Sequence, residues 1–148
     1  MVSVDFPFGT HREEVYAGVA ELFAKRSTCG RLQVGCVAVK DGRIICTGYN
    51  GALEGERDYD GNCKCDLTKP CEKAIHAEAN LISYAARNGI ALDSSWLYVT
   101  HSPCIKCAEL IIQSGIAKIF YGIEFRDAKG LNYLRENNIY VNPYGVHK

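Results

Sequence analysis

One segment in the second half of the chain, residues 96–123, reads WLYVTHSPCIKCAELIIQSGIAKIFYGI. Its pattern predicts a short strand over Trp96–Thr100, a helix over Cys104–Ser114 and a second strand over Lys118–Ile123. Gly115 supplies the stop signal for the helix. Strand–helix–strand units of this length imply parallel strands joined by a crossover helix, with helices lying on the faces of the sheet.

The rest of the chain adds elements on both sides of this unit. We expect an amphipathic helix over His11–Lys25, strands over Val34–Val39 and Arg43–Tyr49, a helix over His76–Asn88, a polar helix over Asp127–Asn137 and a last strand over Ile139–Asn142. The first two of these strands are joined by Asp41-Gly42, a dipeptide typical of tight hairpins. Residues 1–148 are therefore interpreted as a single α/β domain, a three-layer α-β-α sandwich with a mixed five-stranded sheet and helices on both faces.

A long polar connection, Ala52–Lys73, contains three of the cysteines. A structureless loop of this length is unusual in a compact domain unless it is functional or is held by something. We therefore expect this loop either to be functional or to be tied to another part of the chain.

Charge and composition exclude several classes of protein. The chain has 148 residues with 17 Lys+Arg and 17 Asp+Glu, so its formal net charge is zero. This balance argues against a long nucleic-acid or anionic-membrane surface. No apolar run approaches the roughly 18 residues of a membrane span. Residues 1–8 have neither a basic start nor an apolar core, so we expect no secretory signal and a cytoplasmic protein, or one of the host cytoplasm if viral.

Eight cysteines are the unusual feature of the composition. In a reducing compartment, clustered thiols bind metal more often than they pair as disulfides. Cys36 and Cys46 lie in apolar runs and are interpreted as small core residues. The others form two groups: Cys29, Cys63, Cys65 and Cys71 surround the polar connection, and Cys104 and Cys107 form a C-x-x-C motif.

The motif that indicates chemistry joins His76-Ala77-Glu78 to Pro103-Cys104-Ile105-Lys106-Cys107. Each half lies at a predicted helix start, where the helix dipole favours thiolate over thiol. One imidazole and two thiolates make three zinc ligands and leave a fourth position open, which is the composition of a catalytic zinc site. Taken alone, the C-x-x-C motif also fits half of a structural zinc ribbon or a redox pair.

Glu78 distinguishes the catalytic interpretation from these alternatives. Residues two apart on a helix diverge by about 200°, so Glu78 is badly placed to bind the same metal as His76. A carboxylate beside a zinc-bound water can instead move protons during hydrolysis of an amidine-like C–NH2 group. The combination H-x-E…P-C-x-x-C is the known signature of zinc nucleobase deaminases.

From about His11 to Val141 the chain resembles the deoxycytidylate (dCMP) deaminases. The resemblance rests on RSTC at 26–29, VGCV at 34–37, GYNG at 48–51, HAE at 76–78, THSPCIKC at 100–107 and FRD at 125–127. The zinc motif alone would equally fit cytidine, riboflavin-precursor or tRNA-adenosine deaminases. The segments RSTC and GYNG narrow the resemblance to the dCMP deaminases.

The resemblance implies a cytidine-deaminase fold, a homo-oligomer (a hexamer or a smaller even assembly) and conversion of dCMP to dUMP for dTMP synthesis. It also implies activation by dCTP and inhibition by dTTP, each with Mg2+. Some viral relatives accept dCTP as well as dCMP. A nucleic-acid deaminase of the tRNA-adenosine type and a non-catalytic zinc module are the alternatives.

Site roles also follow from the resemblance. His76, Cys104 and Cys107 are expected to hold the catalytic Zn2+, and Glu78 to move protons. The residues expected to bind substrate or effector are Arg26, Gly48, Tyr49, Asn50, Gly51, Ala77, Tyr84, Arg87, Ser102, Phe125 and Arg126.

Within that set the roles differ. Asn50 is expected at the nucleotide sugar, or as a simple turn cap. Phe125, where relatives tend to have Tyr, is expected to stack on the pyrimidine or to be plain packing. Arg26 and Arg126 are phosphate candidates, because a guanidinium fork suits a phosphate dianion.

The remaining residues are expected at the effector, at subunit contacts or at the substrate ring. Gly48–Gly51 is linked to effector binding. Tyr84 and Arg87 are tied to subunit contacts and effector response, although Tyr84 is more simply a core residue. Arg87 would also complement the helix dipole. The Ala77 N–H lies at a helix start and would donate to the cytosine carbonyl.

The four remaining thiols, Cys29, Cys63, Cys65 and Cys71, fit a closed structural zinc site that would pin the long loop to the first helix. Relatives often carry a second zinc here with variable ligands. The alternative is that these cysteines are free buried thiols.

Overall fold

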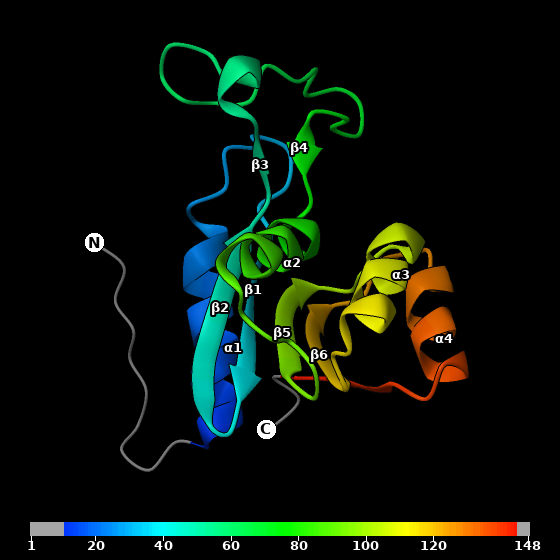
Figure 1. Cartoon of the computed structure of the whole chain (residues 1–148). Helices are drawn as coiled ribbons and strands as arrows, with labels where there is room; N and C mark the ends of the chain where they lie inside the picture. The colour runs from blue at the N-terminus through cyan, green and yellow to red at the C-terminus, as the bar shows by residue number, and fades with distance from the viewer. Residues whose placement is uncertain (1–10, 145–148) are drawn as a thin grey trace.

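The computed structural model describes residues 11–144, and a five-stranded sheet lies at the centre of the molecule (Figure 1). Residues 1–10, on which the expectation about a secretory signal rests, lie outside this range. The strands, in the order β2-β1-β5-β6-β7, are Arg43–Tyr49 (β2), Gly35–Lys40 (β1), Trp96–His101 (β5), Lys118–Ile123 (β6) and Tyr140–Pro143 (β7). All five predicted strands are confirmed, with bounds that shift by one residue at most.

Strand directions confirm the mixed sheet. β1 pairs antiparallel with β2 and with β5, whereas β5, β6 and β7 are parallel. The β1–β2 hairpin turns at Asp41 and Gly42, which have φ angles of 52° and 75°. Two consecutive positive φ angles are what a type I′ hairpin turn requires, and Asp-Gly tolerates them.

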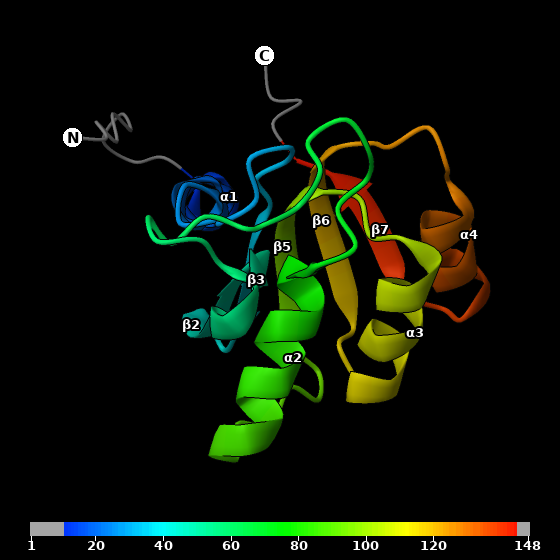
Figure 2. The same cartoon turned by 90° about the horizontal axis from the view of Figure 1, so that it is seen from above.

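Helices cover both faces of the sheet, as Figure 2 shows from above. They are α1 (Arg12–Ala24), α2 (Ala77–Asn88), α3 (Ile105–Ser114) and α4 (Lys129–Glu136). α1 packs Ala17 and Ala20 against Val37 and Tyr98 on one face. The other three helices enclose a larger core on the opposite face. The predicted three-layer sandwich is therefore confirmed. Within residues 11–144, no helix is both long and apolar enough to cross a membrane.

A glycine sets how closely α2 approaches β2. A Cβ atom on Gly48 would lie 2.5 Å from the Ala77 carbonyl oxygen and 2.9 Å from the Leu81 Cβ. Real Cβ atoms do not come this close to backbone, so only glycine lets the first turn of α2 rest on the strand. The start of α2, which carries the predicted zinc ligand His76, is positioned by this contact.

The long loop contains elements that the sequence pattern did not predict. Its ends form a separate two-stranded antiparallel sheet, β3 (Gly51–Ala52) and β4 (Ala74–Ile75). A short 3-10 helix, η1 (Glu54–Glu56), follows β3. Two-residue strands are too short to show a period, so no sequence pattern could predict them. In Figure 1 the segment between the two strands, residues 53–73, projects from the body of the domain; we call it the projecting loop.

Candidate functional site

The predicted zinc ligands come from the starts of two neighbouring helices. His76 and Cys104 are the N-cap residues of α2 and α3, and both have extended backbone angles. Neither side chain caps its own helix, so both are available to a ligand. Cys107 lies in the first turn of α3 and is buried. The positive ends of two helix dipoles therefore meet where these side chains converge.

Distances within the zinc triad, as we call His76, Cys104 and Cys107, fit a tetrahedral metal. The His76 Nδ1 lies 3.6 Å from the Cys104 Sγ and 3.4 Å from the Cys107 Sγ. The three ligand atoms all lie within 4.8 Å of one another. Zinc bonds of about 2.3 Å to sulfur and 2.0–2.1 Å to nitrogen place such donors roughly 3.6 Å apart at a tetrahedral angle. Both N–S spacings agree with that value.

The pKa values of the two thiols of the triad are shifted in opposite directions. Hydrogen bonding from Cys107, and then from His76, lowers the pKa of the Cys104 thiol to about 3. The hydrogen bond to Cys104, together with burial, raises the pKa of Cys107. The surroundings of Cys104 therefore favour its thiolate form, and zinc binding would displace the proton that the pair retains.

Glu78 is buried beside the triad. Glu78 is only 3% exposed, and burial raises the pKa of its carboxyl group to about 7. It does not belong to the group of three close ligand atoms, yet it lines the same cavity as His76 and Cys104. The structure therefore separates the three metal donors from a carboxyl group that faces the same space.

A cavity of about 420 Å³ opens next to the triad. Four of the residues predicted to bind nucleotide line it: Asn50, Ala77, Ser102 and Phe125. Sequence reasoning assigned no ligand role to six other lining residues: Arg31, Leu32, Val34, Pro70, Ala74 and His101. Two members of the triad, His76 and Cys104, thus line the cavity together with Glu78 and a wall that comes from the segment after α1.

One aromatic wall of the cavity is a pair of rings. Phe125 stacks on His101 with ring centroids 5.4 Å apart and an interplanar angle of 22°. The Phe125 backbone N–H donates to the Ser102 Oγ at 2.9 Å, and the His101 ring bonds to the Thr100 hydroxyl at 2.8 Å. Sequence reasoning missed His101, although its place just before Ser102 at the end of β5 was an available signal.

Asn50 lines the cavity, but its side chain is engaged by the backbone. Its Oδ1 accepts the Val34 N–H at 2.8 Å, and its Nδ2 donates to the Leu32 carbonyl at 2.7 Å. The buried amide therefore fixes the segment 32–34 against the start of β3. Any contact with a sugar would come in addition to these bonds.

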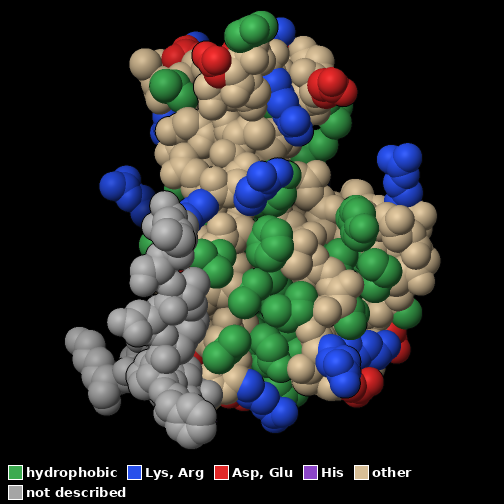
Figure 3. Space-filling model, turned by 90° about the vertical axis from the view of Figure 1, so that its left-hand side faces the viewer, with side chains coloured by type: hydrophobic (Ala, Val, Ile, Leu, Met, Phe, Trp, Pro, Cys, Tyr) green, Lys and Arg blue, Asp and Glu red, His purple; other side chains and the backbone are tan. Residues whose placement is uncertain are grey.

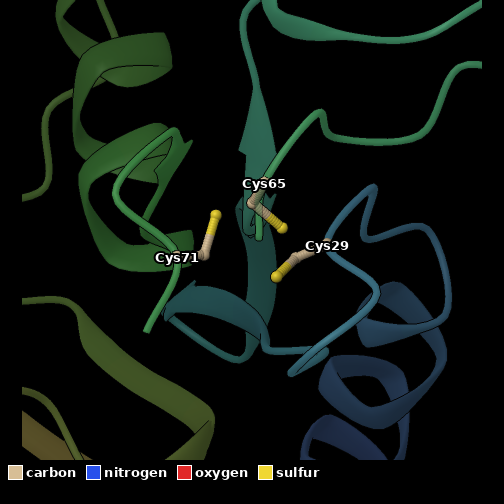
Figure 4. Close-up of side chains that lie close together, drawn as sticks. All are labelled: Cys29, Cys65 and Cys71. Carbon is tan, nitrogen blue, oxygen red and sulfur yellow. The ribbon is translucent and has the colours of Figure 1, made fainter. Parts of the chain in front are cut away.

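A second group of sulfur atoms lies in the loops. Cys29, Cys65 and Cys71, which we call the thiol cluster, come from three segments and place their sulfurs within 4.8 Å of one another (Figure 4). The Cys63 Sγ is not in this tight group but lies 3.6 Å from the Cys71 Sγ. Burial raises the pKa of Cys71, but the backbone N–H groups of Ala74 and Lys73 outweigh it and lower that pKa to about 7. Cys36 and Cys46 are buried in the core, as predicted.

The other predicted binding residues lie elsewhere. Gly48, Tyr49, Gly51, Tyr84 and Arg87 line a separate groove of about 760 Å³ between β2 and α2, together with Arg57. Figure 3 shows a band of hydrophobic side chains on this side of the molecule. The interpretation of Tyr84 as core is wrong, since this residue is 56% exposed.

Neither phosphate candidate lies in the cavity. The Arg26 guanidinium lies over the Tyr49 ring, 5.8 Å from its centroid, and Tyr49 lines the other groove. Arg126 is exposed, and it is absent from the lining of both spaces.

Comparison with known proteins supports the zinc interpretation. Residues 10–123 match a family model described as the cytidine and deoxycytidylate deaminase zinc-binding region. The chain is 39% identical over 114 residues to the ComE operon protein 2 of Bacillus subtilis, covering 76% of this chain but only 60% of that protein. It is 37% identical to the deoxycytidylate deaminase of Mycobacterium phage D29, over 74% of this chain and 92% of the phage protein.

A solved structure gives the same comparison in three dimensions. The dCMP deaminase of cyanophage S-TIM5, in complex with dCMP and dUMP, superposes with a TM-score of 0.75 at 33% identity. The superposition covers 88% of this chain and 95% of the phage chain. The predicted cytidine-deaminase fold is therefore confirmed.

Proposed function

Because this chain belongs to the cytidine and deoxycytidylate deaminase family, we propose that it is a zinc-dependent hydrolase that converts dCMP to dUMP and ammonia and so supplies dUMP for dTMP synthesis. The observation that carries the proposal is the spacing of the zinc triad beside the buried Glu78, at the wall of a cavity of about 420 Å³. The phage relatives named deoxycytidylate deaminase and the dCMP–dUMP complex of the cyanophage enzyme support this choice of substrate.

In this mechanism His76, Cys104 and Cys107 would hold the zinc, which would lower the pKa of the attacking water. Glu78 takes one proton from the attacking water and passes it to the ring nitrogen. It then takes the second proton from the same oxygen, as the carbonyl forms and the C–N bond breaks, and passes it to the departing amine, which leaves as ammonia. The Ala77 N–H at the start of α2 donates to the cytosine carbonyl, and Phe125 offers a stacking face supported by His101.

Ammonia release tests the substrate. We expect turnover of dCMP and much slower turnover of deoxycytidine and cytidine. Turnover of dCTP as well would show a bifunctional pocket. Release only from a tRNA, with a steep dependence on salt, would show a nucleic-acid deaminase instead. No release from any nucleotide, from protein that contains zinc, would contradict the proposal.

The groove between β2 and α2 is the proposed effector site for dCTP, an activator, and dTTP, an inhibitor, each with Mg2+. Arg57 and Arg87 line it and would offer two guanidinium groups to a triphosphate. Asn80 on α2 donates to the Tyr49 carbonyl at 2.8 Å, which ties this groove to the helix that begins after His76. An effector bound in the groove would therefore change the orientation of α2.

Kinetics with effectors test this second proposal. We expect Arg87→Ala to keep basal dCMP turnover and to lose the response to dCTP–Mg2+ and dTTP–Mg2+. Arg135→Ala, on the exposed side of α4, is the matched control and should respond normally. A wild-type enzyme that ignores both triphosphates would contradict the effector site. Light scattering would test the proposed homo-hexamer separately.

A second, structural Zn2+ in the thiol cluster is the last part of the proposal. Cys29, Cys65 and Cys71 converge, and Cys63 lies next to Cys71. The Cys63–Cys71 sulfur spacing of 3.6 Å is close to the roughly 3.8 Å between two thiolates on one tetrahedral zinc. Metal analysis of the purified protein should find two zinc ions per chain, and a value of one would contradict the second site.

A further inference from the structure

A single arginine, Arg31, lines the candidate active-site cavity. We propose that Arg31 binds the phosphate of the nucleotide and thereby makes the enzyme prefer a nucleoside monophosphate to the free nucleoside. This inference rests on the proposed function. It replaces Arg26 and Arg126 as phosphate candidates with a residue that no sequence motif singled out.

The backbone around Arg31 is fixed on both sides. Asn50 bonds to the Leu32 carbonyl and to the Val34 N–H, as described above. The carbonyl of Cys29, two residues before Arg31, accepts a hydrogen bond from the side-chain amide of Gln33, two residues after it. The wall that carries Arg31 is therefore set before substrate arrives, which reduces the entropy lost on binding.

The guanidinium group is oriented but not neutralised. Its NH1 donates to the Leu67 carbonyl at 3.3 Å, which uses one of its five N–H donors. Among residues 11–144, no carboxylate forms an ion pair with Arg31 within 4.0 Å. The nearby Asp66 carboxylate is bonded to the Thr68 N–H and hydroxyl at 2.9 and 2.6 Å. The remaining donors of Arg31 are thus available to an anion.

Other cations of the cavity do not compete for this role. His76 is assigned to the metal, and His101 is stacked on Phe125. Burial lowers the pKa of His101, which disfavours the charged form of its ring. Arg31 is exposed, whereas Glu78 and Ala77 are buried, so the charge lies toward the open side of the cavity and the reacting groups lie inside. A nucleotide that places its ring at the metal would direct its phosphate outward.

Substrate comparison in Arg31→Gln tests the inference. We expect kcat/KM for dCMP to fall about 10- to 100-fold, mainly through KM, while kcat/KM for deoxycytidine stays unchanged. Arg31→Lys, which keeps the charge but not the fork, should recover part of the loss. Arg135→Gln is the matched control and should behave as wild type. Equal losses for both substrates, or a loss confined to Arg126→Gln or Arg26→Gln, would overturn the inference.

Calorimetry with dUMP separates this inference from the proposed function. If wild type binds dUMP and Arg31→Gln binds it at least tenfold more weakly, the phosphate assignment holds even for a chain that deaminates nothing. If both proteins bind dUMP equally, the assignment is wrong even when dCMP is turned over. Thermal melting of Arg31→Gln should match wild type, because Arg31 is exposed and its hydrogen bond to the Leu67 carbonyl is an exposed one.

Discussion

The two sulfur sites of this chain use the same donor atom in different surroundings. The zinc triad mixes one imidazole with two thiols at the starts of two helices, beside a buried carboxyl and a cavity. The thiol cluster consists only of thiols, which come from loop segments. The carboxylates next to it in the chain, Asp66 and Glu72, are exposed. The number of cysteines does not distinguish a catalytic site from one that holds a loop. The types of donor atom and the groups beside them make that distinction.

The largest expected effect comes from breaking the triad. Cys104→Ser removes one of three ligands, so we expect dCMP turnover to fall by at least about 1,000-fold because the metal-activated water is lost. Metal analysis should show one zinc ion fewer per chain. Since the side chain lies at a helix start rather than in the core, the circular dichroism spectrum should stay that of a folded domain. Retained turnover with retained zinc would contradict the assignment.

Cys65→Ser makes the corresponding change in the thiol cluster. Cys65 does not line the cavity, unlike Cys29 and Cys71, so kcat for dCMP should stay within about threefold of wild type. The protein should lose the second zinc, and a protease should cut the projecting loop faster, because the loop is no longer held. Loss of turnover as large as that of Cys104→Ser would erase the difference between the two sites.

Gly48→Ala tests whether the close packing of α2 on β2 positions the zinc triad. The added Cβ would meet the Ala77 carbonyl and the Leu81 side chain, so we expect a loss of about 1–3 kcal/mol in the free energy of unfolding and reduced dCMP turnover. Gly55→Ala in the projecting loop is the matched control, since its Cβ would meet nothing within 4 Å. Denaturant unfolding measures both. Equal stability of the two variants would show that α2 does not rest on β2 as described.

Lys73→Ala should have the smallest effect. Lys73 pairs with Glu56 in the projecting loop, and both side chains are exposed. The hydrogen bond from Lys73 lowers the pKa of Glu56, so any stabilisation is present above the ordinary pKa of glutamate and is lost as the pH falls below it. Thermal melting at neutral pH should shift little, because exposed ion pairs contribute little. A large loss of stability would mean that this pair, rather than the thiol cluster, holds the loop.

How much was predictable from sequence differs between the elements. Helical spacing of apolar residues placed the helices, and apolar runs bounded by turn residues placed the long strands, each within one or two residues. The central strands β1 and β5 are buried on both faces, so they appear as continuous apolar runs. The site motif placed the triad and Glu78 together because each half lies at a helix start. β3 and β4 have two residues each and left no pattern.

Division of the binding residues between two spaces was not visible in the sequence. Side chains of successive residues in an extended chain point to opposite sides, so Asn50 lies at the cavity while its two neighbours, Tyr49 and Gly51, lie at the other groove. Gly48, which has no side chain, also lines the groove. Arg31 lies in an irregular segment, where no period shows which way a side chain points. Arg26 and Arg126 were chosen for their motifs, and motif membership does not place a side chain in a cavity.

Replacing Glu78 with Gln tests the central claim, that the triad binds the metal and Glu78 moves the protons, most directly. The measurement is zinc content together with ammonia release from dCMP for Glu78→Gln and wild type. We expect unchanged zinc content and a fall in kcat of about 100- to 10,000-fold, the usual contribution of a general acid–base group. Loss of zinc along with activity would make Glu78 a ligand, and full activity would assign proton transfer to another group; either result would contradict the claim.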